Sequence, residues 1–393
     1  MPSSRRFRIG VDFHTWDGIF QGSRSHVLGL YKQAIGLAPE LDFVFFLEGT
    51  ASLAASHLEF LAPNVTLARM RHAPGPVRLG LQLPWMQLRH RLDLLHMQYR
   101  LPLLRLGACA STMHDVLFET HPQFFSPSFV WQSKLTYRQA ARRADLLFSV
   151  SRYSAGEIAR CYGVDSARIH ITPNGVDRRR FFPGQEGAAA VAALGLQPHG
   201  YLLSVGRLEP RKNQELLVRA YAALGPDAPP LVLVGQRDFG YGGVFAAIES
   251  LSLQTRVRVI ERLSDNELPA VLRHARAFVY PAVAEGFGMP VAEAMASGVP
   301  VITSNTTSLP EVAGEAALLV DPQDAAGWTA AMRRVLDDGG DAGLCRQMVE
   351  KGLGQAEQFD WTRSAQVFVD QVRAFLSRNT TGVSAPAGRQ GGH

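Results

Sequence analysis

Short apolar runs alternate with amphipathic helical periods along nearly the whole chain, and no other feature constrains the fold as strongly. In the first half, the runs expected to form strands are residues 7–13, 41–47, 93–97, 108–115, 144–151 and 168–174. In the second half, they are residues 201–206, 230–235, 256–261, 277–281, 299–304 and 317–321. Strand-helix alternation with continuously apolar strands is typical of parallel sheets covered by helices on both faces. The sequence therefore predicts an α/β protein with two doubly wound, Rossmann-like sheets.

The chain has 393 residues, which is long for one hydrophobic core and favours two domains at about 150 residues each. Residues 174–200 combine glycine, proline, three consecutive arginines and a run of small residues, which are signals of a boundary. We expect one domain over residues 1–175 and a second over residues 176–360. The low-complexity segment 378–393 is expected to be a disordered tail.

The composition of the chain indicates the cellular compartment in which it works. The sequence contains no run of about 18 apolar residues that could span a membrane, and no apolar segment of a signal peptide precedes the first expected strand. The three cysteines, Cys109, Cys161 and Cys345, are far apart and form no metal or redox motif. We therefore expect a cytoplasmic protein, with peripheral membrane contact as an open alternative.

The positive charge is concentrated in the first half. Residues 1–180 carry 22 Lys and Arg against 13 Asp and Glu, a net charge of +9, whereas the remainder carries 18 against 22, a net charge of −4. This asymmetry suggests that the two halves meet different partners. No aromatic and basic stacking motif accompanies the arginines, so nucleic acid is not an expected partner.

One basic amphipathic stretch has two interpretations. Residues 77–92 mix Leu, Trp and Met with Arg78, Arg89 and Arg91. Such a surface can lie on an anionic bilayer. It can equally be a core helix with a cationic outer face, broken at Pro84.

Ligands of doubly wound sheets bind outside the carboxyl ends of the strands, so the residues that follow each strand are candidates for a site. The first strand of the second half ends at Gly206, and Arg207 and Lys212 follow it. Glycine permits close approach of a ligand to the backbone, and the two cations could neutralise a diphosphate. On their own, the same residues also fit an ordinary solvated loop.

The stretch EGFGMPVAE follows the fourth strand of the second half. Gly286 and Gly288 permit a tight turn, and Pro290 suits the first turn of the next helix. Amides at a helix N-terminus favour an anion, while Glu285 and Glu293 could accept hydrogen bonds from sugar and ribose hydroxyls. The alternative is that Glu293 is only an acid favoured by the helix dipole.

These motifs occur together in a recognisable order. GRLEPRKN, VLVGQ, EGFGMPVAEAMASGVPVITSN and SLPEVAGEAALLVDP together resemble glycosyltransferase family four, a group of retaining enzymes with the GT-B fold. The resemblance is strong from Ile171 to about Pro322 and includes ITPNGVD. In the first half, ACASTMHD followed by VLFETHPQFF is similar to a subgroup of which many members transfer mannose or related hexoses to lipid-linked saccharides.

The resemblance implies two Rossmann-like domains that face each other across a cleft. The N-terminal domain would bind the acceptor and the C-terminal domain the nucleotide-sugar donor. A C-terminal helix over residues 361–377 would pack back on the first domain.

The resemblance also implies roles for individual residues. Arg207 and Lys212 would bind the donor diphosphate and stabilise the departing nucleoside diphosphate, Glu285 would contact the donor sugar, and Glu293 would hold the ribose. The catalytic residues implied are His114, Arg207, Lys212 and Glu285, with His114 reaching the sugar from the opposite domain. The donor-binding residues implied are Gly22, Gly206, Leu263, Phe287, Gly288, Met289, Pro290 and Glu293. The family often has two consecutive glycines in this loop, whereas this chain has Gln21 followed by Gly22.

The implied activity is transfer of a hexose, with mannose from GDP-mannose favoured, to a saccharide acceptor in cell-surface polysaccharide synthesis such as lipopolysaccharide O-antigen. The family is thought to work by front-face attack, in which the leaving diphosphate takes the acceptor proton. No DxD-like carboxylate pair ends a strand in the donor half, so we expect no metal and no cofactor. A UDP-sugar-dependent transferase and a non-catalytic nucleotide-sugar-binding protein remain alternatives. A dinucleotide-dependent oxidoreductase is disfavoured, because no G-x-G-x-x-G follows the first strand.

Overall fold

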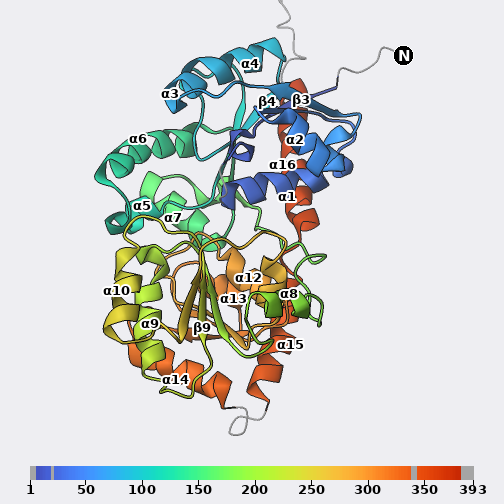
Figure 1. Cartoon of the computed structure of the whole chain (residues 1–393). Helices are drawn as coiled ribbons and strands as arrows, with labels where there is room; N and C mark the ends of the chain where they lie inside the picture. Colours follow the sequence, from blue (N-terminus) through green and yellow to red (C-terminus); the bar gives the residue numbers. More distant parts are fainter. Residues whose placement is uncertain (1–5, 19–21, 338–342, 382–393) are drawn as a thin grey trace, which may run out of the picture.

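The computed structural model describes residues 6–18, 22–337 and 343–381, and within them it contains two parallel sheets (Figure 1). The N-terminal sheet has the order β3-β2-β1-β4-β5-β6-β7 and the C-terminal sheet the order β10-β9-β8-β11-β12-β13. All the pairings in both sheets are parallel. The prediction of two doubly wound Rossmann-like domains is therefore confirmed.

The strands lie close to the expected apolar runs. In the N-terminal sheet they are β1 Arg8–Asp12, β2 Asp42–Leu47, β3 Val65–Arg69, β4 Leu94–Gln98, β5 Cys109–Met113, β6 Leu146–Ser149 and β7 Ile169–Ile171. In the C-terminal sheet they are β8 Leu202–Val205, β9 Leu231–Val234, β10 Val257–Ile260, β11 Ala277–Tyr280, β12 Val301–Ser304 and β13 Ala317–Val320. Strand β3 was not among the expected runs, because it is a half-exposed edge strand without a continuous apolar sequence.

Helices cover both faces of each sheet. Those of the N-terminal domain are α1 Gly22–Leu37, α2 Thr50–Ser56, α3 Gly75–Val77, α4 Leu83–Arg89, α5 Leu117–Thr120, α6 Pro127–Arg143 and α7 Arg152–Tyr162. Those that follow are α8 Ala188–Ala193, α9 Gln214–Ala222, α10 Gly242–Ser250, α11 Leu268–Arg273, α12 Met289–Ala296, α13 Leu309–Ala313, α14 Ala325–Leu336, α15 Leu344–Ala356 and α16 Trp361–Thr381. Short single turns are η1 His14–Trp16, η2 Leu58–Leu61, η3 Arg78–Gln82, η4 Pro122–Phe124, η5 Ser166–Arg168 and η6 Pro210–Lys212.

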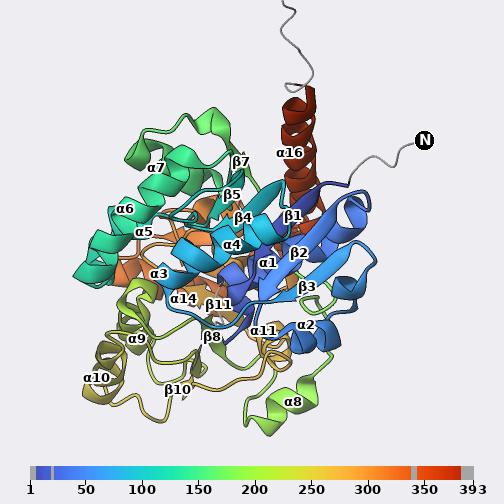
Figure 2. The same cartoon turned by 90° about the horizontal axis from the view of Figure 1, so that it is seen from above.

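Each sheet has one hydrophobic core on either side of it. In the N-terminal domain, α1 and α16 pack on one face of the sheet, and α4, α6 and α7 on the other. The last helix, α16, returns to the N-terminal domain, where Phe368, Val369 and Val372 join the core of α1 (Figures 1 and 2). It continues to Thr381, so residues 378–381 are helical and not part of a disordered tail as expected. Residues 382–393 of that expected tail lie outside the described residues.

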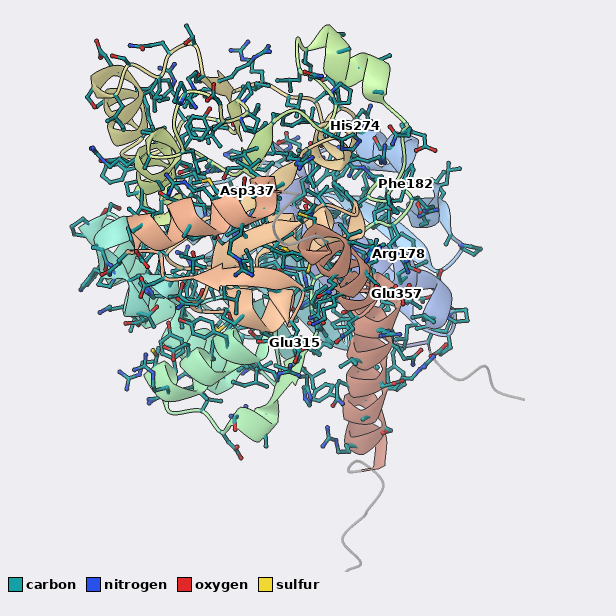
Figure 3. The ribbon with its side chains drawn as sticks, turned by 90° about the horizontal axis from the view of Figure 1, so that it is seen from below. Arg178, Phe182, His274, Glu315, Asp337 and Glu357 are labelled. Carbon is teal, nitrogen blue, oxygen red and sulfur yellow. The ribbon has the colours of Figure 1, made fainter. Side chains whose placement is uncertain are left out.

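The chain crosses between the domains beside α16. The amide of Val176 donates to the carbonyl of Phe359 at 2.9 Å, which joins the two crossing segments. On the underside of the C-terminal domain, the first crossing segment is held by Arg178, which pairs with Glu357 at 3.2 Å (Figure 3). The same segment is fixed at Phe182, whose carbonyl accepts from Arg273 Nε at 2.6 Å.

The amphipathic stretch of residues 77–92 forms one continuous helical path from α3 through η3 to α4. Its expected break at Pro84 is replaced by the single wide turn η3, a π-helical turn that ends just before the proline. Proline removes an amide and crowds the carbonyl four residues earlier, and a wide turn relieves both effects. Within the described residues, no helix is long and apolar enough to cross a membrane.

Candidate active site

The carboxyl ends of the two sheets meet at the loop after β11. Two hydroxyls at the start of α7, those of Ser151 and Ser154, donate to the carbonyl of Gly286 at 2.7 and 2.9 Å. A Cβ at Gly286 would lie 2.6 Å from the carbonyl oxygen of His114, which follows β5. Loops that follow strands in both domains therefore touch, and the carboxyl ends of strands are where doubly wound sheets bind ligands.

Lys212 lies in this region, on the turn η6 that follows β8. Its ammonium donates to Tyr280 Oη at 2.7 Å and forms an ion pair with Glu285. The Tyr280 hydroxyl in turn donates to the same carboxylate at 3.0 Å. Burial lowers the pKa of Lys212, and the Glu285 carboxylate opposes that shift. The result is a compact, sparsely solvated cation at the carboxyl edge of the sheet.

Glu285 is held by two cations. Besides Lys212, Arg211 approaches the Glu285 carboxylate at 3.1 Å and donates to the carbonyl of Ala284 at 2.8 Å. Burial raises the pKa of Glu285, but the charges of Lys212 and Arg211 outweigh it and hold that pKa below its usual value. Glu285 is therefore ionised at neutral pH, and its oxygens can accept hydrogen bonds from a ligand.

Arg207 does not join this cluster. Its guanidinium donates to Asp238 at 2.7 Å, and 42% of its side chain is exposed. Gly206 precedes both cations in the chain, and a Cβ there would lie 3.6 Å from the nearest methylene of Lys212. A ligand that engages both cations must therefore draw Arg207 away from Asp238.

Contacts with Ser308 and Phe359 hold the loop of residues 285–288 in place. Ser308 Oγ lies 2.9 Å from the carbonyls of both Glu285 and Phe287, and the Phe287 ring packs edge-on against Phe359 at 5.3 Å. Gly288 has a φ of 106°, a conformation that favours glycine, and it precedes α12. This turn sets the backbone of Phe287, Gly288 and Met289 at the start of a helix.

Glu293 lies one turn into α12. Burial raises its pKa to about 8, and the charge of Arg180 opposes that shift. The carboxyl group is thus protonated at neutral pH and can both donate and accept a hydrogen bond, which suits a vicinal diol. Pro290 occupies the first turn of α12, and Leu263, after β10, packs against the same core.

His114 approaches from the N-terminal domain. The side chain is buried, its Nε2 forms a hydrogen bond with Gln98, and its ring lies 4.9 Å from that of His26. Burial, followed by the neighbouring His26 and His96, holds the pKa of His114 well below its usual value. The imidazole is therefore neutral.

Gly22 is the first residue of α1, and a Cβ there would meet nothing within 4 Å in the described part of the chain. The preceding residue, Gln21, lies outside the described residues. The role expected for this loop stays a prediction.

Comparison with known proteins decides the family. The family described as glycosyl transferases group 1 matches residues 194–354, and glycosyltransferase family 4 matches residues 22–180. The O-antigen chain mannosyltransferase B of Escherichia coli is 33% identical over 262 residues, which cover 65% of this chain and 68% of that protein. The chain belongs to the group 1 glycosyltransferases.

One further relative by sequence and one solved structure are also similar to this glycosyltransferase. A D-inositol 3-phosphate glycosyltransferase of Salinispora tropica is 31% identical over 63% of this chain, which spans only 54% of that relative. The sucrose-phosphate synthase structure from Thermosynechococcus elongatus aligns with a TM-score of 0.77 at 21% identity, covering 95% of this chain and 100% of that one. The structural likeness supports the GT-B fold expected from the sequence.

Several residues of the glycosyltransferase site escaped the sequence analysis. Arg211 and Asp115 lie within electrostatic reach of Glu285, and burial raises the pKa of Asp115. Ser151, Ser154 and Ser308 hold the loop of residues 285–288, which we call the glycine loop. Arg211 could have been found as the neighbour of Lys212, and Asp115 as the neighbour of His114. The serines carry no such signal, because their partners are carbonyls more than 20 residues away.

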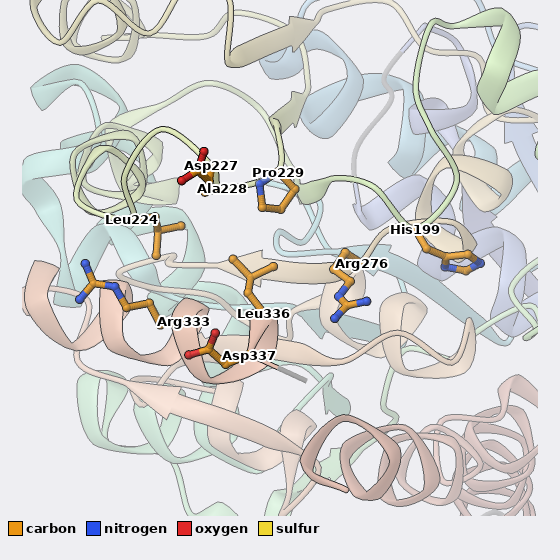
Figure 4. Close-up of a pocket in the computed structure, with 9 residues that line it drawn as sticks. All are labelled: His199, Leu224, Asp227, Ala228, Pro229, Arg276, Arg333, Leu336 and Asp337. Carbon is orange, nitrogen blue, oxygen red and sulfur yellow. The ribbon is translucent and has the colours of Figure 1, made fainter. Parts of the chain in front are cut away.

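A separate hollow lies at the opposite, amino-terminal edge of the C-terminal sheet. It has a volume of about 550 Å³, and His199, Arg276, Asp227 and Arg333 are among its lining residues (Figure 4). These residues precede strands or lie on α14, whereas the loops that meet the N-terminal domain follow strands. The hollow is therefore not part of the site around Glu285.

The Glu293→Gln variant is expected to be more stable than the wild type at high pH. Between the ordinary value of 4.5 and the folded value of about 8, the unfolded chain has lost the Glu293 proton that the folded chain keeps. Stability of the wild type therefore falls as pH rises through this window, by up to about 1.4 kcal/mol per unit, and glutamine removes that penalty. Thermal denaturation at pH 5 and pH 8 checks this: the advantage of the variant should be small at pH 5 and larger at pH 8. An advantage independent of pH would contradict it.

Proposed function

We propose that this glycosyltransferase transfers a hexose, with mannose the favoured sugar, from a nucleoside-diphosphate sugar to a saccharide acceptor that is lipid-linked. The observation that carries the proposal is the cluster of Lys212, Arg211, Tyr280 and Glu285 beneath the glycine loop. It supplies buried cations for a diphosphate and an ionised carboxylate for sugar hydroxyls at a single strand edge. The mannosyltransferase named among the relatives supports the choice of sugar.

In the proposed reaction, the bond between the anomeric carbon and the diphosphate oxygen breaks while the acceptor oxygen forms its bond on the same face. The acceptor proton passes to the departing diphosphate. Lys212, and Arg207 once it leaves Asp238, would stabilise the negative charge that develops on that diphosphate. His114 is neutral and presents an imidazole that can exchange a hydrogen bond with a sugar hydroxyl without adding charge.

The same residues account for the proposal that no divalent metal takes part. In the proposed complex, Lys212 and Arg207 would neutralise the diphosphate, which is the role a metal ion would otherwise have. No group of three or more potential metal-binding His, Cys, Asp or Glu side chains occurs within the described ranges. Transfer should therefore persist after treatment with EDTA.

The test is a transfer assay with GDP-mannose and a detergent-solubilised, lipid-linked saccharide. Release of nucleoside diphosphate measures turnover, and NMR of the product gives the anomeric configuration. The proposal expects α-linked product from the α-linked donor. An inverted product would contradict the retaining mechanism, and absence of diphosphate release with GDP- and UDP-sugars would favour a non-catalytic nucleotide-sugar-binding protein.

A further inference from the structure

The helical path from α3 through η3 to α4 has two apolar faces. Its inner face, with Leu79, Leu83 and Met86, is buried in the core against the N-terminal sheet. A second row points outward, and its members are exposed: Val77 41%, Leu81 69%, Trp85 53% and Leu88 58%. The spacing of this row follows one stripe of a helix. One buried face is enough to hold a helix on a sheet, so the outer stripe needs another explanation.

Two neighbouring segments extend the outer stripe. The loop after β4 exposes Leu103 and Leu104 by 53% and 57%, and the amide of Leu103 donates to the carbonyl of Leu79 at 3.0 Å. Helix α6 exposes Trp131 by 77% and Leu135 by 67%, one turn apart. Both views place α3 beside α6 on the same side of the domain (Figures 1 and 2). We call residues 75–91, 99–106 and 127–143 the docking face.

The loop with Leu103 also joins α6, through Arg105. Its guanidinium bonds to the carbonyl of Arg143 and pairs with Asp145 at 2.5 Å, both at the end of α6. The three segments of the docking face are therefore fixed relative to one another. The exposed apolar residues of all three segments therefore lie on one side of the N-terminal domain, and exposed apolar surface of this kind marks an interaction site.

The charge of the docking face has one sign. Its three segments contain nine Lys and Arg and no Asp or Glu. Arg78, Arg105 and Lys134 pair with acids from elsewhere in the chain. Arg89, Arg91, Arg138, Arg142 and Arg143 are exposed, and Arg89 lies over the Trp85 ring at 5.0 Å. Exposed Leu and Trp flanked by arginine are the side chains that fit the boundary between anionic headgroups and acyl chains.

We propose that the docking face binds the surface of an anionic phospholipid bilayer, with its leucines and tryptophans inserted at the headgroup boundary. A symmetric contact with a second copy of the chain would bring the cations of one docking face against those of the other, which is unfavourable. The docking face would be the surface from which a lipid-linked acceptor reaches the site, and this purpose rests on the proposed function. The same loop begins at Tyr99, whose ring lies 5.1 Å from that of His114.

The test is flotation of the full chain with vesicles, without donor or acceptor. Wild type should bind vesicles of phosphatidylglycerol and phosphatidylcholine, bind pure phosphatidylcholine weakly, and dissociate as salt is raised. The double variants L81Q/L135Q and R89E/R138E should each partition about tenfold more weakly. Brominated lipids should quench the fluorescence of Trp85 and Trp131, which are exposed, and not that of the buried Trp16 and Trp328.

The matched controls are exposed residues outside the docking face. Leu58 is 76% exposed on η2, and Arg363 is exposed on α16, so L58Q and R363E should bind vesicles as the wild type does. Lack of wild-type binding at low salt, or equal losses in the controls, would overturn the inference. A dimer in light scattering that L81Q/L135Q dissociates would also overturn it, in favour of a second copy as the occupant.

Failure of this inference and failure of the proposed function give different results. Vesicle binding needs no nucleotide sugar, and transfer to a detergent-solubilised acceptor needs no bilayer. L81Q/L135Q should keep wild-type turnover in the detergent assay, because neither residue contacts the cluster around Glu285. Turnover without vesicle binding would contradict only the proposal that the docking face binds a bilayer. Vesicle binding without turnover would contradict only the proposed transferase activity.

Discussion

Replacing Lys212 with alanine is expected to lower turnover by about 10²–10³-fold, the loss seen when one group that stabilises developing negative charge is removed. The fold should survive, because Arg211 still lies 3.1 Å from the Glu285 carboxylate and keeps that buried charge paired. Initial rates of nucleoside diphosphate release at saturating donor measure the effect, and thermal denaturation checks the fold.

Two further variants make the Lys212 experiment decisive. Lys212→Met keeps the stem that packs against Gly206 and removes only the charge, so it should lose as much turnover as the alanine variant even if the latter proves unstable. Arg219→Ala removes an exposed cation on α9 that pairs with Glu215 and should change turnover little. Wild-type turnover in a folded Lys212 variant would refute the assigned role.

The second large effect is expected from Gly286→Ala. A Cβ at this position would lie 2.6 Å from the carbonyl oxygen of His114 and 2.8 Å from Asp115 Cβ, and the nearer of these atoms belongs to the backbone. The contact between the glycine loop and the N-terminal domain must therefore widen. Because reacting groups from both domains need close placement, we expect turnover to fall by about 10²-fold or more.

Gly354→Ala is the matched control for Gly286→Ala, since a Cβ at Gly354 on α15 would meet nothing within 4 Å in the described part of the chain. Glu311→Gln tests the same interface without touching the loop. The Glu311 carboxylate accepts from the amides of Arg152 and Tyr153 at 3.0 and 3.1 Å, at the start of α7. Both interface variants should increase the radius of gyration in X-ray scattering, and unchanged scattering and turnover in Gly286→Ala would contradict this account.

The sequence was informative where local pattern decides structure. Apolar runs located twelve of the thirteen strands in the described part of the chain, and strand ends placed Lys212 and Glu285 at one edge. It could not locate β3, whose half-exposed sequence lacks a continuous apolar run. The expected convergence of Arg207 with Lys212 is not present in the described structure, because the Arg207 side chain pairs with Asp238, a partner that residue spacing does not reveal.

Local sequence patterns could not predict the contacts between the two domains. Gly286 meets His114, about 170 positions earlier in the chain, and sequence alone gives no register between the two sheets. For residues 77–92 the sequence left a membrane-facing surface and a core helix as alternatives, and it did not show that one helical path carries both a buried face and an exposed apolar stripe. Nor did the sequence show that α6 extends this stripe, since Trp131 and Leu135 look like core residues of an ordinary helix.

The central claim is that Lys212 and the glycine loop of residues 285–288 bind the diphosphate of an activated sugar. Thermal denaturation of wild type and Lys212→Met against a panel of GDP- and UDP-sugars in EDTA tests it most directly, because a ligand that binds the folded state raises the melting temperature. The account predicts a concentration-dependent rise for wild type with at least one nucleotide sugar, GDP-mannose first, and a much smaller rise for Lys212→Met. Equal rises in both proteins, or no rise with any nucleotide sugar, would contradict it.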